Sequence, residues 1–140
     1  MGMTTKIQQL GVVSNPYTPI PSALVAGAGF VAKGFSGNVE QLSYLMAEAM
    51  SYKGFSLIDI FHPCVSFNKI NTHIWYKKRV YDLAKTDHDF SDYKKALKVA
   101  HSDPDRIPTG IIYKNKTVLR NLVKLEKGSR INGFVLCDGV

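Results

Sequence analysis

An apolar run that ends abruptly in His-Pro-Cys constrains this chain more than any other feature of its sequence. The run covers residues 55–61 (FSLIDIF) and is entered from Gly54. Four to eight residues rich in aromatic and β-branched side chains, bounded by breakers, are typical of a buried strand. Pro63 has no N–H to donate to a sheet ladder. We therefore expect the strand to end there and Cys64 to lie on the loop just past its carboxyl end.

The position of Cys64 makes it the first candidate functional residue. In open α/β sheets, ligands and cofactors collect at the carboxyl ends of the strands. The alternative is a small buried thiol, because cysteines outside disulfides are among the most buried residues. His62, two residues before Cys64, is the histidine closest to this position in the sequence.

The flanking segments predict a strand–helix–strand unit. Residues 30–33 form a short apolar stretch, and residues 39–52 carry apolar side chains at helical spacing after Asn38, a good N-cap. With the strand over 55–61, this order predicts a parallel pair. The nearly continuous apolar character of the second strand indicates cover on both of its faces. Its Asp59 then needs a structural hydrogen bond or a place at the sheet edge.

Further elements are expected on both sides of this unit. Gly27 and Gly29 lack the rest of a nucleotide-binding fingerprint, which favours close packing as their role. The remaining expectations are a loop over 1–18, a short helix from Pro19 or Pro21 to Ala26, a helix over 93–101 capped by Ser91 or Asp89, a strand over 109–113 and a basic helix over 117–126. The sequence thus predicts an α/β fold, in which helices flank a parallel sheet of three to four strands, with residues 1–140 as a single domain.

Composition narrows the class of protein. The chain has 140 residues, of which 45% are hydrophobic and 21% charged, as in soluble globular proteins. No apolar run approaches the roughly 20 residues that span a bilayer, so no membrane association is expected. The N-terminus lacks the apolar core of a signal peptide. Two cysteines make no disulfide framework, which favours a cytoplasmic location.

The charge is strongly basic, with a net charge of +7 and most Lys and Arg after residue 68. A basic face fits an anionic cofactor, an acidic protein or nucleic acid. Trp75 and Tyr76 lie next to Lys77, Lys78 and Arg79, as in single-strand binders, but one such cluster more often anchors a loop. A metal site at His88 between Asp87 and Asp89 is not expected, because consecutive residues rarely point at one ion.

Three stretches carry a family resemblance. They are Gly54-Phe-Ser-Leu-Ile-Asp-Ile-Phe-His-Pro-Cys-Val-Ser-Phe-Asn68, the segment from Asn15-Pro-Tyr-Thr-Pro to Ala26-Gly-Ala-Gly-Phe-Val-Ala-Lys33, and Ile107-Pro-Thr-Gly-Ile-Ile-Tyr113. The chain resembles the C-terminal portion of the β subunit of 2-oxoacid:ferredoxin oxidoreductases. The resemblance implies part of a thiamine-diphosphate-binding domain, with the family-like core over 19–113 and a divergent extension over 114–140.

The resemblance also implies cofactors and partners for a full complex. These are thiamine diphosphate, magnesium and a 4Fe–4S cluster, with the rest of the β subunit and the α subunit as partners and ferredoxin as an indirect one. Cys64 matches the family's fourth cluster ligand, while the Gly-Asp-Gly motif and the other three cysteines have no counterpart in this sequence. No cofactor is therefore expected in the isolated chain.

Two functions of different classes follow. The first is a part of the oxidoreductase β subunit that is inactive alone, because the diphosphate and magnesium motif is missing. The second is a stand-alone basic α/β module that binds an anionic partner or nucleic acid, with nucleic acid the less expected of the two. Half of such a domain would expose a sheet edge and apolar surface, so we also expect the isolated chain to self-associate.

Overall fold

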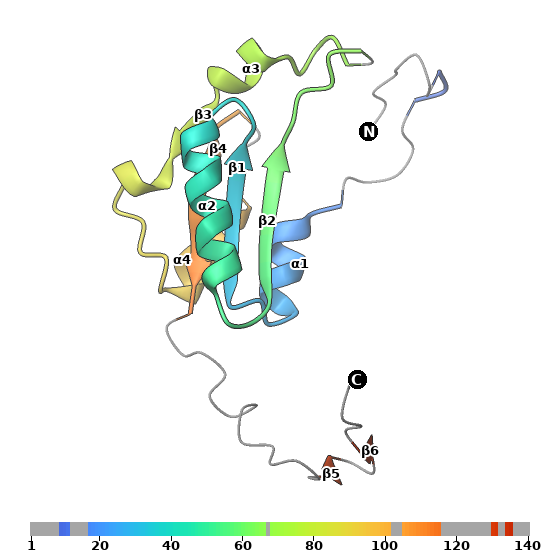
Figure 1. The fold of residues 1–140 in the computed structure, drawn as a ribbon. Helices are drawn as coiled ribbons and strands as arrows, with labels where there is room; N and C mark the ends of the chain where they lie inside the picture. Colours follow the sequence, from blue (N-terminus) through green and yellow to red (C-terminus); the bar gives the residue numbers. More distant parts are fainter. Residues whose placement is uncertain are drawn as a thin grey trace.

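The computed structural model describes residues 9–11, 17–66, 68–101, 105–115, 130–131 and 134–135. The basic helix expected over 117–126 and Cys137 lie outside these residues. The elements in chain order are α1 (Pro19–Val25), β1 (Phe30–Phe35), α2 (Val39–Ser51), β2 (Ser56–Phe61), α3 (His73–Lys77), β3 (Val80–Asp82), the 3-10 turn η1 (Leu83–Lys85), α4 (Tyr93–Ala100), β4 (Ile107–Lys114), β5 (Arg130–Ile131) and β6 (Phe134–Val135). Figure 1 shows their arrangement.

The main sheet has four strands in the order β2-β1-β4-β3. The pair β1–β2 is parallel, as the strand–helix–strand order predicts, and β3–β4 is parallel as well. The sheet is nevertheless mixed, because β4 runs antiparallel to β1. The prediction of an all-parallel sheet was wrong at this one pairing. The β4 strand follows a long connection from β2 through α3, β3 and α4, and nothing in its own sequence encodes its direction.

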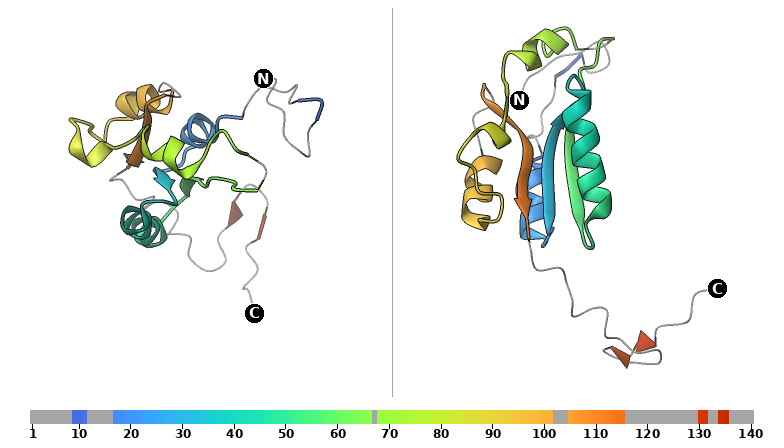
Figure 2. Two further views of the ribbon diagram at one scale, coloured as in Figure 1. Left: turned by 90° about the horizontal axis from the view of Figure 1, so that it is seen from above. Right: turned by 60° about the vertical axis from the view of Figure 1, so that its left-hand side comes forward.

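Helices cover both faces of the sheet, so the molecule has three layers (Figure 2). On one face, α1 and α4 enclose a cluster that includes Leu24, Val31, Ala96 and Ile112. On the other face, α2 packs Leu45 against Phe30 and Ala32. Successive β1 residues therefore alternate between the two clusters, as the pleat requires. Removal of this apolar surface from water stabilises the central strand, which is buried along almost its whole length.

Most helix ends lie where their capping residues put them. Two prolines occupy the first turn of α1, and Asn38 caps α2 by accepting from the Gln41 N–H at 3.2 Å. The prediction of the α4 cap was wrong. Asp92 caps α4 by accepting from the N–H groups of Lys94 and Lys95, while Asp89 accepts from Ser91. Asp92 directly precedes the helix, which is the position from which a carboxylate reaches the first free N–H groups.

Gly29 packs closely against Tyr52, as the packing interpretation of the glycine pair predicts. A Cβ at Gly29 would lie 2.0 Å from the Tyr52 hydroxyl. The neighbouring Gly27 adopts a φ of +85° just after α1, a backbone conformation that favours glycine. These two residues let the chain turn from α1 into β1 within a short span.

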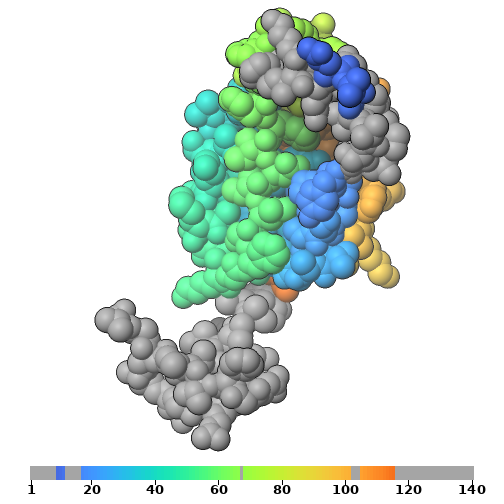
Figure 3. Space-filling model, turned by 90° about the vertical axis from the view of Figure 1, so that its right-hand side faces the viewer, coloured from blue at the N-terminus to red at the C-terminus, as the bar shows by residue number. Residues whose placement is uncertain are grey.

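The strand β2 is an edge strand and not a fully buried one. Its residues are half-buried, and Ile60 is exposed. Figure 3 shows β2 as a stripe that reaches the surface between α1 and α2. Within the part of the chain that the structure describes, no strand pairs with its outer side. The apolar run in the sequence predicted that β2 is covered on both faces, but the described residues leave it partly exposed.

None of the described helices is both long and apolar enough to cross a lipid bilayer.

Candidate functional site at the carboxyl end of β2

Cys64 lies at the carboxyl edge of the parallel pair β1–β2, as the sequence predicts. The strand ends at Phe61, Pro63 is buried and the Cys64 side chain is exposed. The alternative of a small buried thiol is therefore wrong. Because the buried proline anchors the chain immediately before it, the thiol is presented to the surface from a fixed point.

A turn orders the backbone that follows Cys64. The Asn68 N–H donates to the Cys64 carbonyl at 3.2 Å, which closes the loop over that residue. The Asn68 side chain then accepts from the N–H groups of Ile70 and Asn71 at 2.9 and 3.0 Å. Its amide group also donates to the Asn71 side chain at 3.0 Å. Such asparagine turns replace the hydrogen bonds that an irregular loop would otherwise leave to water.

The helix α3 brings the chain back over the ends of β1 and β2. Thr72 caps the helix by accepting from the Trp75 N–H at 3.3 Å. The Tyr76 ring then packs against Phe35 at the end of β1 and Phe61 at the end of β2, with centroid distances of 5.7 and 5.3 Å. His73 lies 5.0 Å from the same Phe35 ring. These aromatic contacts hold the loop 62–72 at both of its ends.

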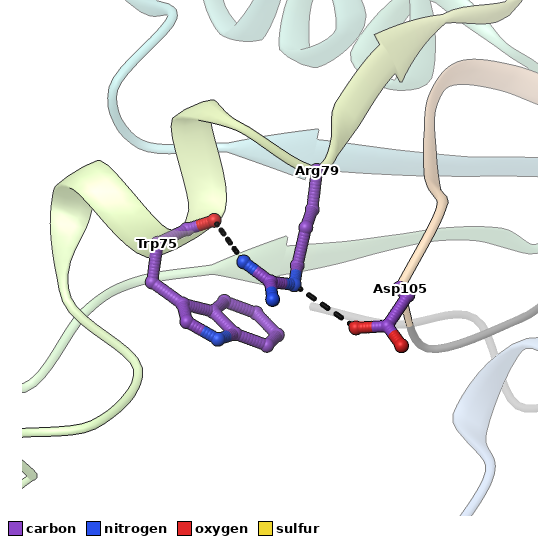
Figure 4. A network of polar contacts seen from close by, with 3 residues as sticks. All are labelled: Trp75, Arg79 and Asp105. Carbon is purple, nitrogen blue, oxygen red and sulfur yellow. Dashed lines mark hydrogen bonds and ion pairs between the residues drawn. The ribbon is translucent and has the colours of Figure 1, made fainter.

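Trp75 and Arg79 form the outer anchor of this region (Figure 4). The Arg79 guanidinium lies over the Trp75 ring, 4.1 Å from its centroid. It donates to the Trp75 carbonyl at 3.3 Å and to Asp105 at 3.1 Å. This geometry favours the loop-anchor interpretation of the aromatic–basic cluster. The Arg79 guanidinium covers one face of the Trp75 indole, so a nucleic-acid base cannot stack on that face.

Lys33 and Asp59 place opposite charges just below the site. The two residues are register partners in β1 and β2, and both are half-buried. The Lys33 ammonium lies 5.2 Å from the centroid of the Phe61 ring. Burial lowers the pKa of Lys33, and the Asp59 charge opposes this effect. Burial, together with the Asp59 charge, raises the pKa of the Tyr76 phenol.

The described residues do not themselves form a metal centre. No group of three His, Cys, Asp or Glu side chains gathers anywhere among them. The His88 ring nitrogen Nε2 hydrogen-bonds the Ile112 carbonyl at 2.9 Å. His62 is exposed on the loop beside Cys64. Cys64 can supply one ligand, and any further ligands must come from elsewhere.

Lys33 and Tyr76 were missed as members of this site by sequence reasoning. Tyr76 was grouped with its neighbouring cations, although its ring packs under the loop. The parallel pairing predicted from strand–helix–strand order could have found Lys33, because a shared register places it opposite the acid in the second strand. No comparable local signal points to Tyr76, since its position depends on how α3 folds back.

Comparison with known proteins places this geometry in a family. Residues 64–126 match the family that is described as the C-terminal region of the pyruvate ferredoxin oxidoreductase beta subunit. The match begins at Cys64 and includes α3, β3, α4 and β4.

Curated relatives extend the match toward the N-terminus. A "2-oxoacid:ferredoxin oxidoreductase subunit beta" of a Sulfolobus species is 35% identical over 116 residues, which cover 76% of this chain and 38% of the relative. The protein of the same description from Saccharolobus solfataricus is 32% identical over 128 residues, or 84% of this chain and 42% of the relative. The chain therefore spans about two fifths of the length of these relatives.

A solved structure shows the same fold. It is described as "2-oxoglutarate:ferredoxin oxidoreductase from Magnetococcus marinus with 2-oxoglutarate, coenzyme A and succinyl-CoA bound". The match has a TM-score of 0.76 and 35% sequence identity, and it covers 88% of this chain and 43% of that one. By sequence and by fold, this chain belongs to the β-subunit family of 2-oxoacid:ferredoxin oxidoreductases and corresponds to its C-terminal portion.

Proposed function

We propose that the chain is the C-terminal part of a 2-oxoacid:ferredoxin oxidoreductase β subunit, and that it works only when joined to the remaining part of that subunit and to an α subunit. The complete cytoplasmic complex would decarboxylate a 2-oxoacid oxidatively, transfer the acyl group to coenzyme A and pass the electrons to ferredoxin. Cys64 is the residue that this chain contributes to the redox chemistry.

The observation that carries the proposal is the exposed thiol at the carboxyl edge of β1–β2. Pro63 is buried while Cys64 is exposed, so the side chain faces outward from an anchored backbone. An iron–sulfur cubane takes four thiolates. Cys64 is the only cysteine of the described residues. A cluster that uses this thiol must therefore draw ligands from another segment or chain.

The residues of this chain do not fit a complete site for the diphosphate cofactor. A magnesium–diphosphate site needs oxygen ligands and backbone N–H groups around the phosphates. No carboxylate group of that kind gathers among the described residues, and the Gly-Asp-Gly motif has no counterpart in the sequence. Thiamine diphosphate and magnesium would be held by the remaining part of the subunit, which explains why we expect no activity from the isolated chain.

The test is reconstitution. The chain is co-expressed with an α subunit and with a β-type polypeptide that carries the Gly-Asp-Gly motif and three cysteines, and the products are purified through a tag on this chain. We expect a brown complex that contains iron and reduces a dye in the presence of a 2-oxoacid, whereas the chain alone does neither. Failure to capture the complementary polypeptide would contradict the proposal.

The role of Cys64 is tested within the same complex. We expect Cys64→Ser to leave the polypeptides associated while the iron content falls, because one ligand of the cluster is lost. Cys137→Ser is the matched control and should leave the iron content unchanged. If the complex forms and Cys64→Ser keeps all its iron, the partnership stands and the assignment of Cys64 falls.

A further inference from the structure

A separate cavity of about 310 Å³ lies on the α2 side of the sheet, away from the loop that carries Cys64. Its walls come from α2 on one side and from η1 and the segment that follows it on the other, with β4 below. This volume is at the lower end of the range for pockets that hold small molecules. None of the described residues that line it belongs to the segment 62–79.

The clearest sign of a missing partner in this cavity is Gln41. Its Oε1 atom is buried and has no hydrogen-bond partner among the described residues. The cause is a capping box that is only half made. The Gln41 N–H donates to Asn38, but the Asn38 N–H donates to the Phe35 carbonyl and not to the Gln41 side chain. Buried amide oxygens are nearly always satisfied by protein groups or by water, so this acceptor calls for a donor that water or a bound molecule can supply.

The other polar groups of the cavity favour a ligand that donates hydrogen bonds. The donors of two lining residues are already used, because Thr86 Oγ1 donates to the Leu83 carbonyl at 2.8 Å and His88 Nε2 is bonded to the Ile112 carbonyl at 2.9 Å. Asp82 adds a carboxylate, whose Oδ1 atom accepts from the Ala84 N–H at 3.0 Å. No lysine or arginine is among the described residues that line the cavity. An anion would therefore meet the Asp82 carboxylate with no lysine or arginine of the lining to offset its charge.

The shape of the ligand follows from the apolar part of the lining. Tyr44 and Phe90 supply aromatic rings, and Leu45 and Ile111 supply aliphatic surface. The floor contains Gly110, whose φ of +116° is unfavourable for other residues, so the backbone itself forms part of the surface. Aromatic walls suit a planar body.

We propose that this cavity binds a small planar molecule that carries N–H donors and is neutral or cationic. The Gln41 amide oxygen and the Asp82 carboxylate would accept its hydrogen bonds. The 2-oxoglutarate and coenzyme A named for the Magnetococcus marinus structure are anions, so this cavity would be a site distinct from those that hold them. The inference does not depend on the proposed redox function, because it uses none of the residues assigned to it.

Three isosteric probes test the charge and donor preference. Benzamidine, benzamide and benzoate share one planar ring and carry a cationic, a neutral and an anionic head, respectively. Their dissociation constants for the full 140-residue chain are measured by ligand-observed NMR titration. We expect benzamidine to bind at least tenfold more tightly than benzoate, with benzamide between them. Equal affinity for benzamidine and benzoate, or no binding of any probe, would overturn the proposal.

Matched variants locate the binding. Ala84→Leu extends a side chain into the cavity from an exposed lining residue, and Gln41→Leu removes the acceptor; each should weaken benzamidine binding at least fivefold. Ala47→Leu places the same leucine at an exposed position of α2 outside the lining and should change nothing. Asp82→Asn keeps an oxygen for the Ala84 N–H and should remove the advantage of benzamidine over benzamide.

Circular dichroism of each variant shows whether the fold is retained, and only folded variants are compared. Should Ala84→Leu fail to fold, Gln41→Leu and Asp82→Asn carry the decision. Unchanged benzamidine binding in folded Gln41→Leu and Asp82→Asn, or an equal loss in Ala47→Leu, would contradict the site.

Discussion

Lys33 and Asp59 stand opposite each other in the parallel pair β1–β2, on the sheet face that carries Val31 and Leu57 two residues earlier. The pair lies beneath the loop of Cys64, with the Lys33 ammonium beside the Phe61 ring. Its partial removal from water penalises the charged form of Lys33 more than Asp59 favours it, so the pKa of Lys33 falls below 10.5.

This relationship gives a stability that depends on pH. Between the folded pKa of Lys33 and 10.5, the unfolded chain binds more protons than the folded chain, so the contribution of Lys33 to the free energy of unfolding rises with pH. The free energy of unfolding of Lys33→Met, measured relative to wild type, should therefore be highest at pH 7 and should fall toward pH 10. Urea unfolding at pH 7, 9 and 10 measures this. The raised pKa of Tyr76 acts only above pH 10, outside this window.

Lys77→Met controls for the loss of a positive charge, because Lys77 is exposed on α3. The free energy of unfolding of Lys33→Met, relative to that of Lys77→Met, should fall from pH 7 to pH 10. If it stays constant over that range, the burial of Lys33 has no energetic effect.

The Trp75–Arg79 stack should be measurable as a coupling energy. A partly exposed cation–π contact is worth about 0.5–1 kcal/mol, whereas an exposed ion pair contributes about 0–1 kcal/mol. In a double-mutant cycle, Arg79→Met and Trp75→Leu should couple by about 0.5 kcal/mol or more, because each change removes one partner of the stack. Asp105→Asn should cost less, because the Asp105 side chain is 76% exposed. Additive effects of the first two changes would show that the stack contributes nothing.

Gly29→Ala should destabilise the fold by about 1–2 kcal/mol, because the new methyl group meets the Tyr52 hydroxyl and its ring. The Tyr52 ring also packs beside the Phe30 ring, with centroids 6.0 Å apart, which limits the directions in which it can shift. Tyr52→Leu in the same chain should recover part of the loss, as measured by urea unfolding. A fully additive double variant would show that the two residues do not compete for space.

The exposed edge of β2 should make the isolated chain self-associate. Ile60 is 38% exposed on this strand, Phe55 just before the strand is 48% exposed, and Val65 on the loop after it is 75% exposed. A charge on an edge strand blocks such pairing. In sedimentation velocity, Ile60→Lys should shift the chain toward monomer, whereas Met46→Lys on the exposed side of α2 should not. A wild-type chain that stays monomeric at high concentration would contradict this expectation.

The sequence predicted the elements with a strong local signal. Asn38 and the apolar spacing after it locate α2 to within one residue at its end, and Pro63 sets the end of β2 and the position of Cys64. Elements whose existence depends on distant contacts were missed. The β3 strand has three residues and pairs only with β4, and α3 is held by rings from β1 and β2.

The site itself was only partly predictable. The residues next to Cys64 in the sequence already indicate its position. The burial of Lys33 and Tyr76, in contrast, depends on how α3 packs. The cavity beside Gln41 is a similar case. Asn38 and Gln41 have the spacing of a capping box, and only the fold shows that half of it is open.

The sheet order also has a consequence for how this chain is made. A ribosome delivers β1, β2 and β3 before β4, yet β4 lies between β1 and β3. The half-sheet β1–β2 can pair as soon as it emerges, but its inner side stays open until residues 107–114 have been synthesised. The last strand of the sheet to be translated thus closes its centre, so the fold is completed by insertion and not by growth at an edge.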